Sequence, residues 1–164
     1  MTAQPGERAP QASDDERPAR DAFRHFQRIP TRWMDNDAYA HVNNVVYYAW
    51  FDTVVNEHLI RAGGLDIAHS PAIGLVVETH CRFFAPLAFP DAVEAGIAVT
   101  RLGRSSVTYA IGLFREGDAA AAAAGRFVHV WVDRASRRPV DIPERVRAAL
   151  EPLVVDVSPP ASAS

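Results

Sequence analysis

Residues 35–62 read DNDAYAHVNNVVYYAWFDTVVNEHLIRA, a polar loop that leads directly into a long apolar segment. From Asn44 onward, large apolar side chains recur at steps of three and four residues, which is the spacing of one face of an α-helix. Further apolar residues widen this face, so the pattern predicts a helix over 44–62 that is buried on most sides. Gly63 and Gly64 are expected to end it, because glycine is favoured just past a helix C-terminus.

On both sides of this helix the sequence changes to the two-residue period that is typical of β-strands. One strand is expected before the helix, over 23–33, with an interruption at Pro30. Turns are expected at Gly103–Arg104 and at Gly117–Asp118. The strands expected after the helix cover 74–84, 92–102, 107–113 and 126–133, and a short helix over 143–150 follows them.

The last of these strands is apolar on both of its faces. Val128, Val130 and Val132 lie on one face and Phe127, His129 and Trp131 on the other, so both faces must be covered. One helix cannot cover both sides of an antiparallel sheet. The sequence therefore predicts an α+β hotdog fold, in which an antiparallel sheet wraps round one long central helix and a second copy buries its outer face or edge.

The 164 residues, 48% of them hydrophobic and 23% charged, are enough for one globular domain. Residues 1–20 carry almost no large apolar side chain and are expected to form a disordered arm. The expected domain covers 21–157, and the polar tail 158–164 is expected to be disordered, like the N-terminal arm.

Composition also narrows the function classes. A formal net charge of -3 argues against a protein that binds nucleic acid by neutralising phosphates. The single cysteine, Cys81, excludes an internal disulfide and a cysteine-based zinc site. The first residues are polar and charged, so no signal peptide is expected, and no apolar run approaches the about 20 residues that span a bilayer. A cytoplasmic protein without membrane insertion is expected.

The loop before the long helix combines the groups that acyl transfer needs. The first amides of a helix have no partner within the helix and carry positive partial charge, so an amide near Asn44 could polarise a carbonyl group. A carboxylate just upstream could attack that carbonyl or activate a water molecule. The alternative is that Asp35, Asp37, Asn43 and Asn44 only shape the loop and cap the helix, which is a common use of these residues.

The pattern Asp-x-Asp-x-x-x-His-Val-Asn-Asn-x-x-Tyr-x-x-Trp over 35–50 resembles the signature of hotdog thioesterases, in particular the 4-hydroxybenzoyl-CoA thioesterase-like acyl-CoA thioesterases. It is also similar to the hotdog repeats of plant-type acyl-ACP thioesterases. Leu102–Val107, Trp131–Asp133 and Arg138–Pro143 resemble further motifs of the family, so the likeness extends over most of 23–150.

The resemblance implies metal-independent hydrolysis of an acyl-CoA thioester, with coenzyme A entering as part of the substrate and no cofactor. It implies that Asp37 is the nucleophile or general base and that the Asn44 amide polarises the thioester carbonyl. His41 is expected to orient the reacting groups, and Asn43 is expected to contact the substrate. Asp35 is expected to hold the loop by hydrogen bonds.

Two residues depart from the family pattern. Ala40 stands where much of the family has glycine, and Tyr39 stands where the acyl-ACP branch has asparagine.

The helix residues Tyr47 and Trp50 are expected to pack the core rather than to touch substrate.

The turn at Gly103, Arg104 and Ser105 is a second candidate site. In the resembling branch this stretch borders the nucleotide end of coenzyme A, and Arg104 with the hydroxyl of Ser105 could bind phosphate. The alternative is an ordinary hairpin turn with a solvated arginine.

Two other functions remain open at this point: the chain could act on an acyl carrier protein thioester, or it could bind an acyl thioester or a partner without catalysis. A hotdog dehydratase or hydratase is disfavoured, because the sequence lacks the Gly-His-Phe-Pro type of element expected of that class. A homodimer, or a tetramer made of two dimers, is the expected assembly.

Overall fold

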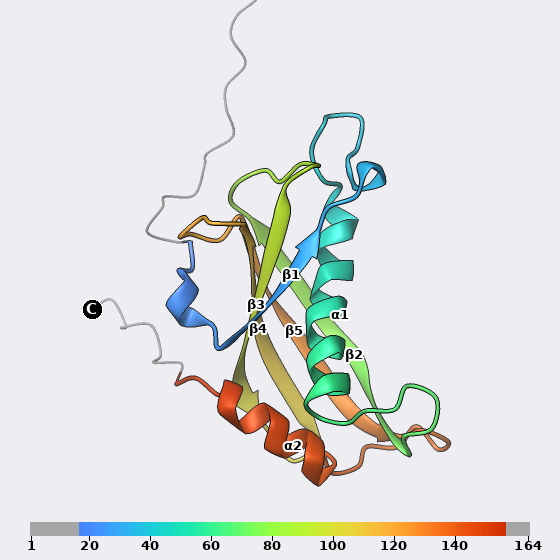
Figure 1. Cartoon of the computed structure of the whole chain (residues 1–164). Helices are drawn as coiled ribbons and strands as arrows, with labels where there is room; N and C mark the ends of the chain where they lie inside the picture. The colour runs from blue at the N-terminus through green and yellow to red at the C-terminus, as the bar shows by residue number, and fades with distance from the viewer. Residues whose placement is uncertain (1–16, 157–164) are drawn as a thin grey trace, which may run out of the picture.

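The computed structural model describes residues 17–156 and shows one curved sheet with a long helix lying along it (Figure 1). The helices are α1 (Asn44–Arg61) and α2 (Glu144–Leu150), with three short 3₁₀ turns elsewhere. The strands are β1 (His25–Pro30), β2 (Ala72–Phe83), β3 (Ala92–Leu102), β4 (Ser106–Arg115) and β5 (Ala123–Asp133).

The five strands form one antiparallel sheet in the order β1-β3-β4-β5-β2. The consecutive strands β3, β4 and β5 pair as a meander, whereas β1 and β2 take the two edges. The sheet curls round α1, which fills its concave side (Figure 1). This arrangement confirms the predicted hotdog fold.

Helix α1 forms the centre of the main core. Its buried side chains are Tyr47, Trp50, Phe51, Val54, Val55 and Leu59, which recur at the helical spacing seen in the sequence. They pack against the inward-facing side chains of the sheet, among them Tyr109, Phe127 and Trp131. The other side of α1 stays open, since Ala49, Asp52 and Thr53 are exposed. Burial on most sides, as expected from the sequence, is therefore correct for only part of the helix.

The outer face of the sheet is covered in part by the chain itself. A second, smaller cluster of buried residues contains Phe23, Ala98, Phe114 and Ala121. On the same face, Val132 is buried and Val130 is partly exposed. That a second copy buries the rest of this face, or the edge of the sheet, stays a prediction.

Several element limits differ from those expected. The first strand, expected over 23–33, covers only 25–30, because Pro30 lacks an amide for the ladder and a 3₁₀ turn follows at Trp33–Asp35. Strand β5 begins at Ala123 instead of 126, within the run of alanines. Pro143 precedes the first helical residue of α2 instead of belonging to it.

The end of the expected N-terminal arm also differs. Residues 17–20 lie against the sheet: the Ala121 amide donates to the Pro18 carbonyl, and Arg20 forms an ion pair with Glu94. The arm expected over 1–20 is therefore at least four residues too long. Its first sixteen residues and the expected tail 158–164 lie outside the described residues.

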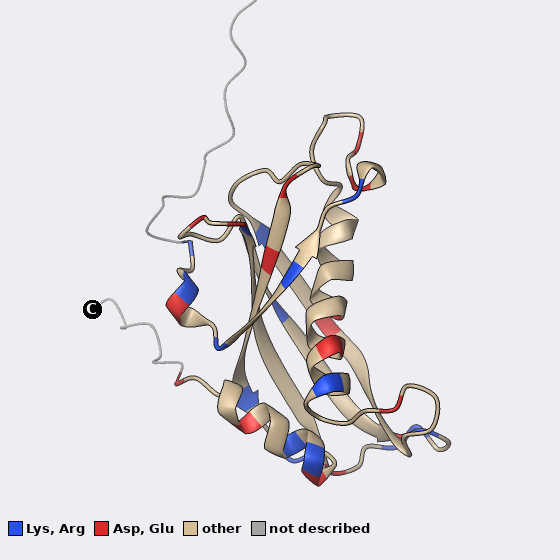
Figure 2. Ribbon diagram, viewed as in Figure 1, with Lys and Arg blue, Asp and Glu red and all other residues tan. Residues whose placement is uncertain are grey.

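Charged residues of both signs are interspersed along the described chain (Figure 2). No helix in residues 17–156 is long and apolar enough to cross a bilayer.

Candidate active site

The loop that precedes α1 is closed at its base and anchored to a distant segment. The Asn43 amide donates to the Asp35 carbonyl oxygen at 2.8 Å, and Asn36 and Val42 form an isolated bridge. The Val42 amide donates to the Leu87 carbonyl oxygen at 2.8 Å, while Asn36 Oδ1 accepts from the Phe89 amide at 3.0 Å. These bonds fix the loop against residues 85–91, which connect β2 to β3.

Asp35 is the structural carboxylate of the loop, as the sequence predicted. Its side chain is 1% exposed and accepts from the Arg32 amide at 2.7 Å. Nε and Nη2 of Arg32 bond to the other carboxylate oxygen at 3.0 and 2.7 Å. With both oxygens occupied, Asp35 is held in place and is not free to attack a substrate.

Asp37 is differently placed, because it is half-buried and has one oxygen free. Its Oδ1 accepts from the Tyr39 amide at 2.8 Å, and no residue in 17–156 bonds to its Oδ2. The Asp37 amide donates to the His41 carbonyl oxygen at 2.8 Å, which closes a tight turn. The turn orients the carboxylate and leaves one oxygen for a substrate or a water molecule.

The turn requires an unusual backbone conformation at Ala40. Its φ is 61°, in the left-handed region that favours glycine, and its amide donates to the Asp37 carbonyl oxygen at 3.1 Å. Much of the resembling family has glycine here, and the structure gives the physical reason. The methyl group of Ala40 costs stability without opening the turn.

The start of α1 leaves one backbone donor free. Asn43 is the N-cap, and its side-chain oxygen accepts from the Val45 amide at 3.1 Å, while its carbonyl accepts from the Val46 amide at 3.0 Å. The exposed Asn44 has no partner for its amide within the described part of the chain. A free amide at the positive end of an 18-residue helix is a donor for a developing oxyanion. Asn43 thus does what the capping alternative expected, while Asn44 keeps its donor available.

A hollow of about 240 Å³ lies beside this helix terminus. It is lined by His41 and Tyr47 and by the end of β2 with the residues after it, Phe83, Phe84, Ala85 and Pro86. Burial raises the pKa of Tyr47 to about 12, and the charge of Asp37 adds to this rise. Asp37 does not itself line the hollow, but its amide is bonded to the carbonyl oxygen of His41, which does.

Cys81 is the one cysteine of the chain, and its thiol is not activated as a nucleophile. Burial raises the pKa of its thiol to about 11, so the thiolate is not formed near neutral pH.

The second candidate site lies at the other end of the molecule. The turn at Gly103–Ser105 packs against the approach to α2: the Ile142 amide donates to the Arg104 carbonyl, and the Trp131 amide donates to the Ser105 carbonyl. Figure 1 shows α2 at the opposite end from the loop before α1. The Arg104 side chain is exposed and forms an ion pair with Asp141. Within one copy of the chain, this turn and Asp37 are not brought together.

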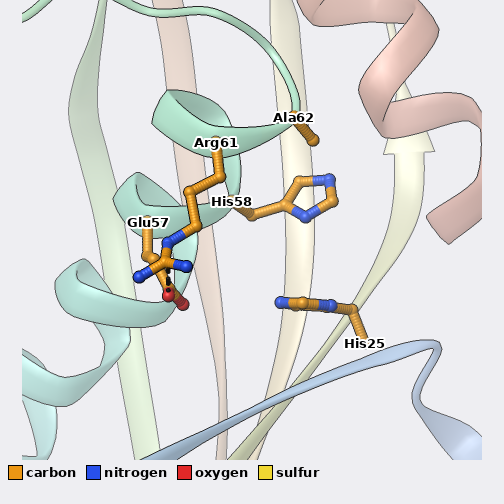
Figure 3. A pocket seen from close by; sticks show the side chains of 5 residues that line it. All are labelled: His25, Glu57, His58, Arg61 and Ala62. Atoms are coloured by element: carbon orange, nitrogen blue, oxygen red, sulfur yellow. Dashed lines mark ion pairs between the residues drawn. The ribbon is translucent and has the colours of Figure 1, made fainter.

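A hollow of about 270 Å³ between β1 and the C-terminal half of α1 contains two histidines (Figure 3). The rings of His25 and His58 are 5.0 Å apart, and His58 Nε2 donates to the Ala149 carbonyl oxygen at 2.9 Å. Glu57, the carboxylate of this hollow, is bound by Arg61 at 2.9 Å. No cluster of three or more residues suited to hold a metal ion occurs in residues 17–156.

The sequence did not identify the aromatic wall of the active-site hollow. Tyr47 is expected from the sequence only to pack the core. Tyr47 is buried, as expected, yet its ring contacts the half-exposed Phe83 at 4.9 Å and both line the hollow. The two residues are 36 positions apart, so no local spacing could have shown their contact.

Comparisons with known proteins agree with this geometry. A family model described as the thioesterase-like superfamily matches residues 31–150. The solved structure of the PA5185 protein from Pseudomonas aeruginosa strain PAO1 is 57% identical, covers 87% of this chain and 99% of that one, and has a TM-score of 0.85. The PA2801 protein from Pseudomonas aeruginosa, to which thioesterase activity has been attributed, is 28% identical over 77% of this chain and 98% of its own, with a TM-score of 0.73.

More distant structures share the fold alone. Slr0204, a 1,4-dihydroxy-2-naphthoyl-CoA thioesterase from Synechocystis, is 16% identical over 76% of this chain and 93% of its own, with a TM-score of 0.69. No curated protein matches the sequence. The family match covers most of the chain, including the loop with Asp37, the start of α1 and the whole sheet from β2 onward. The chain therefore belongs to the thioesterase-like superfamily.

Proposed function

We propose that this chain hydrolyses acyl-CoA thioesters to the free acid and coenzyme A. The observation that carries the proposal is the pair of free groups at the start of α1: the Asp37 oxygen and the Asn44 amide have no partners within the described residues. A carboxylate that activates or attacks and a donor that receives the oxyanion are the groups that this reaction needs.

In the proposed reaction, the thioester carbonyl oxygen accepts a hydrogen bond from the Asn44 amide. Asp37 either takes a proton from a water molecule whose oxygen bonds to the carbonyl carbon, or attacks that carbon itself to give a mixed anhydride that water then opens. In both routes the carbon–sulfur bond breaks and the thiolate leaves and takes up a proton. One water is consumed, and one carboxylic acid and one thiol are released. His41, which is exposed and lines the hollow, orients the substrate or the water.

The turn at Gly103–Ser105 is the proposed contact for the phosphates of coenzyme A. The Gly103 amide is already bonded to the Ser106 carbonyl oxygen, so the Arg104 guanidinium and the Ser105 hydroxyl are the donors left for a phosphate, and the phosphate must compete with Asp141 for the guanidinium. Since this turn lies far from Asp37 in one copy, it serves affinity rather than the chemical step.

The proposed assembly is a homodimer formed through the edge strand β2, and a tetramer would arise from two such dimers. Strand β2 has 12 residues and an unpaired edge, and its Val76 and Val77 are 44% and 60% exposed. A long apolar edge of this kind is a template for pairing with a second strand. We place the enzyme in the cytoplasm, in keeping with a single unpaired cysteine, Cys81.

The test is a thiol-release assay with the purified full chain over a panel of acyl-CoA and acyl carrier protein thioesters, with Asp37→Ala as the control. Thiol release from acyl-CoA that Asp37→Ala abolishes supports the proposal. Thiol release from the acyl carrier protein thioesters alone would show that the acyl group is carried by that protein and not by coenzyme A. No release from any thioester would refute the function. Light scattering at micromolar concentration tests the assembly, and a monomer there would refute the β2 dimer.

A further inference from the structure

A larger hollow, of about 400 Å³, lies on another side of the first turns of α1. Its apolar lining comes from Ile29 and Pro30 at the end of β1 and from Val46, Ala49 and Trp50 of α1, and its polar lining from Arg32 and Thr53. This volume is within the range of pockets that bind small molecules, about 300–1,000 Å³.

Most polar groups of this hollow are already bonded. The Thr53 hydroxyl donates to the Ala49 carbonyl oxygen at 2.8 Å, and Nε and Nη2 of Arg32 bond to Asp35, which leaves Nη1 of that exposed side chain to solvent. Among the described residues, no carboxylate lines the hollow. A ligand in it therefore meets mainly hydrocarbon surface, which suits an aliphatic chain better than a hydroxylated one.

Two residues that line the hollow, Arg32 and Val46, are bonded to the loop that holds Asp37. Val46 is the third residue of α1, and its amide donates to Asn43. Arg32 binds Asp35, whose carbonyl accepts from the Asn43 amide at 2.8 Å. From Val46 to Thr53 the helix rises about 10 Å, so the hollow runs from the active-site end of α1 along its flank.

A second apolar hollow, of about 300 Å³, lies too far from the start of α1 in the same chain to hold the acyl group. It is lined by Ile60, Ile67 and Ile73 among others, and it begins on α1 at Asn56. Asn56 is about 18 Å along the helix from Asn44, beyond the reach of a short or medium acyl chain whose carbonyl lies at the helix terminus.

We infer that the hollow beside Val46, Ala49 and Trp50 binds the hydrocarbon chain of the acyl group, and that the substrates are thioesters of unsubstituted aliphatic acids of medium length. This inference rests on the proposed function and specifies its substrate class. The carbonyl lies at the start of α1, the chain extends along the Ala49 side, and the thiol part leaves over the hollow lined by His41 and Tyr47.

Ala49→Leu tests the inference, because Ala49 is exposed and leucine is nearly as good a helix former as alanine. The readout is the ratio of kcat/KM for octanoyl-CoA to kcat/KM for acetyl-CoA. In the wild type, kcat/KM should rise by up to about fourfold for each methylene group that enters the hollow. Leucine adds three carbon atoms and so takes the room of up to about three methylene groups, and the ratio should fall by up to about sixtyfold.

Two further variants complete the experiment. Ala148→Leu places the same change on an exposed position of α2, at the other end of the molecule, and should leave the ratio unchanged. Val46→Ala enlarges the hollow and should raise the ratio of palmitoyl-CoA to octanoyl-CoA hydrolysis. Circular dichroism checks that each variant is folded.

The outcomes separate the inference from the proposed function. A wild type that releases thiol from no acyl-CoA refutes the function itself. An active wild type whose Ala49→Leu variant keeps the same octanoyl-to-acetyl ratio refutes the hollow as the acyl site, even when the absolute rates change. A wild type that prefers hydroxylated or dicarboxylic acyl groups refutes the substrate class.

Discussion

Replacing Asp37 and Asp35 by asparagine, one at a time, separates the carboxylate that reacts from the one that supports the loop. In Asp37→Asn, the new amide side chain keeps an oxygen for the Tyr39 amide, now bonded at 2.8 Å, but lacks the charge and the basicity of the free oxygen. Asp37→Asn should therefore lower kcat by at least about a hundredfold, the lower limit for loss of a general base. Its free energy of unfolding should change by less than about 0.5 kcal/mol, since the turn keeps its hydrogen bonds.

Asp35→Asn should have the opposite profile. Asp35 is buried and accepts three hydrogen bonds from Arg32, and an amide in its place turns a donor toward another donor. Hydrogen bonds to a charged group contribute about 1.5–3 kcal/mol, but the Arg32 side chain is 67% exposed, which screens its share. We expect a loss of about 1–2 kcal/mol in the free energy of unfolding, or about 3–6 °C in Tm, with a smaller effect on kcat than Asp37→Asn.

The assays are thiol release for kcat and urea unfolding followed by circular dichroism for stability. An inactive but stable Asp35→Asn together with an active Asp37→Asn would show that the roles are reversed. Full activity in both variants would show that the reaction does not take place in this loop.

Three further results are expected. Ala40→Gly should raise the free energy of unfolding by about 0.5–1 kcal/mol, because it relieves a φ of 61° at the expense of some unfolded-state entropy; urea unfolding tests this, and a destabilised variant would contradict it. Burial lowers the pKa of His129 from its ordinary value of 6.5 to about 4, so the neutral ring stabilises the fold above pH 6.5 and up to about 3 kcal/mol is lost as the pH falls toward 4. His129→Leu should therefore show a smaller difference in unfolding free energy between pH 7 and 4.5, and an unchanged difference would assign the acid sensitivity to other groups. Arg104→Ala should raise KM for acyl-CoA and largely spare kcat, whereas Asp141→Ala should lower KM by freeing Arg104; equal KM values in all three proteins would leave the turn without a part in binding.

The sequence predicted the elements of this fold well where a single periodic pattern controlled them. The helical spacing of the apolar residues gave α1 to within one residue, and Gly63 followed its end. The strand expected over 92–102 is β3 as observed, since its apolar alternation from Val93 to Val99 lies between Pro90 and Gly103, although a register shift between Val99 and Arg101 was not foreseen. The sequence also predicted that Asp35 holds the loop by hydrogen bonds, and the structure shows these bonds and a buried carboxylate.

The tertiary structure alone decided which distant residues meet. A two-residue period identifies a strand but not its neighbours, so the order β1-β3-β4-β5-β2 and the open edge of β2 could not be derived from it. The contact of Phe83 with Tyr47 and the pairing of Arg104 with Asp141 depend on that order. The sequence predicted a free amide near Asn44, but only the structure shows which one it is. The amides of Val45 and Val46 are bonded to Asn43, so the Asn44 amide is the donor that remains at the end of the helix.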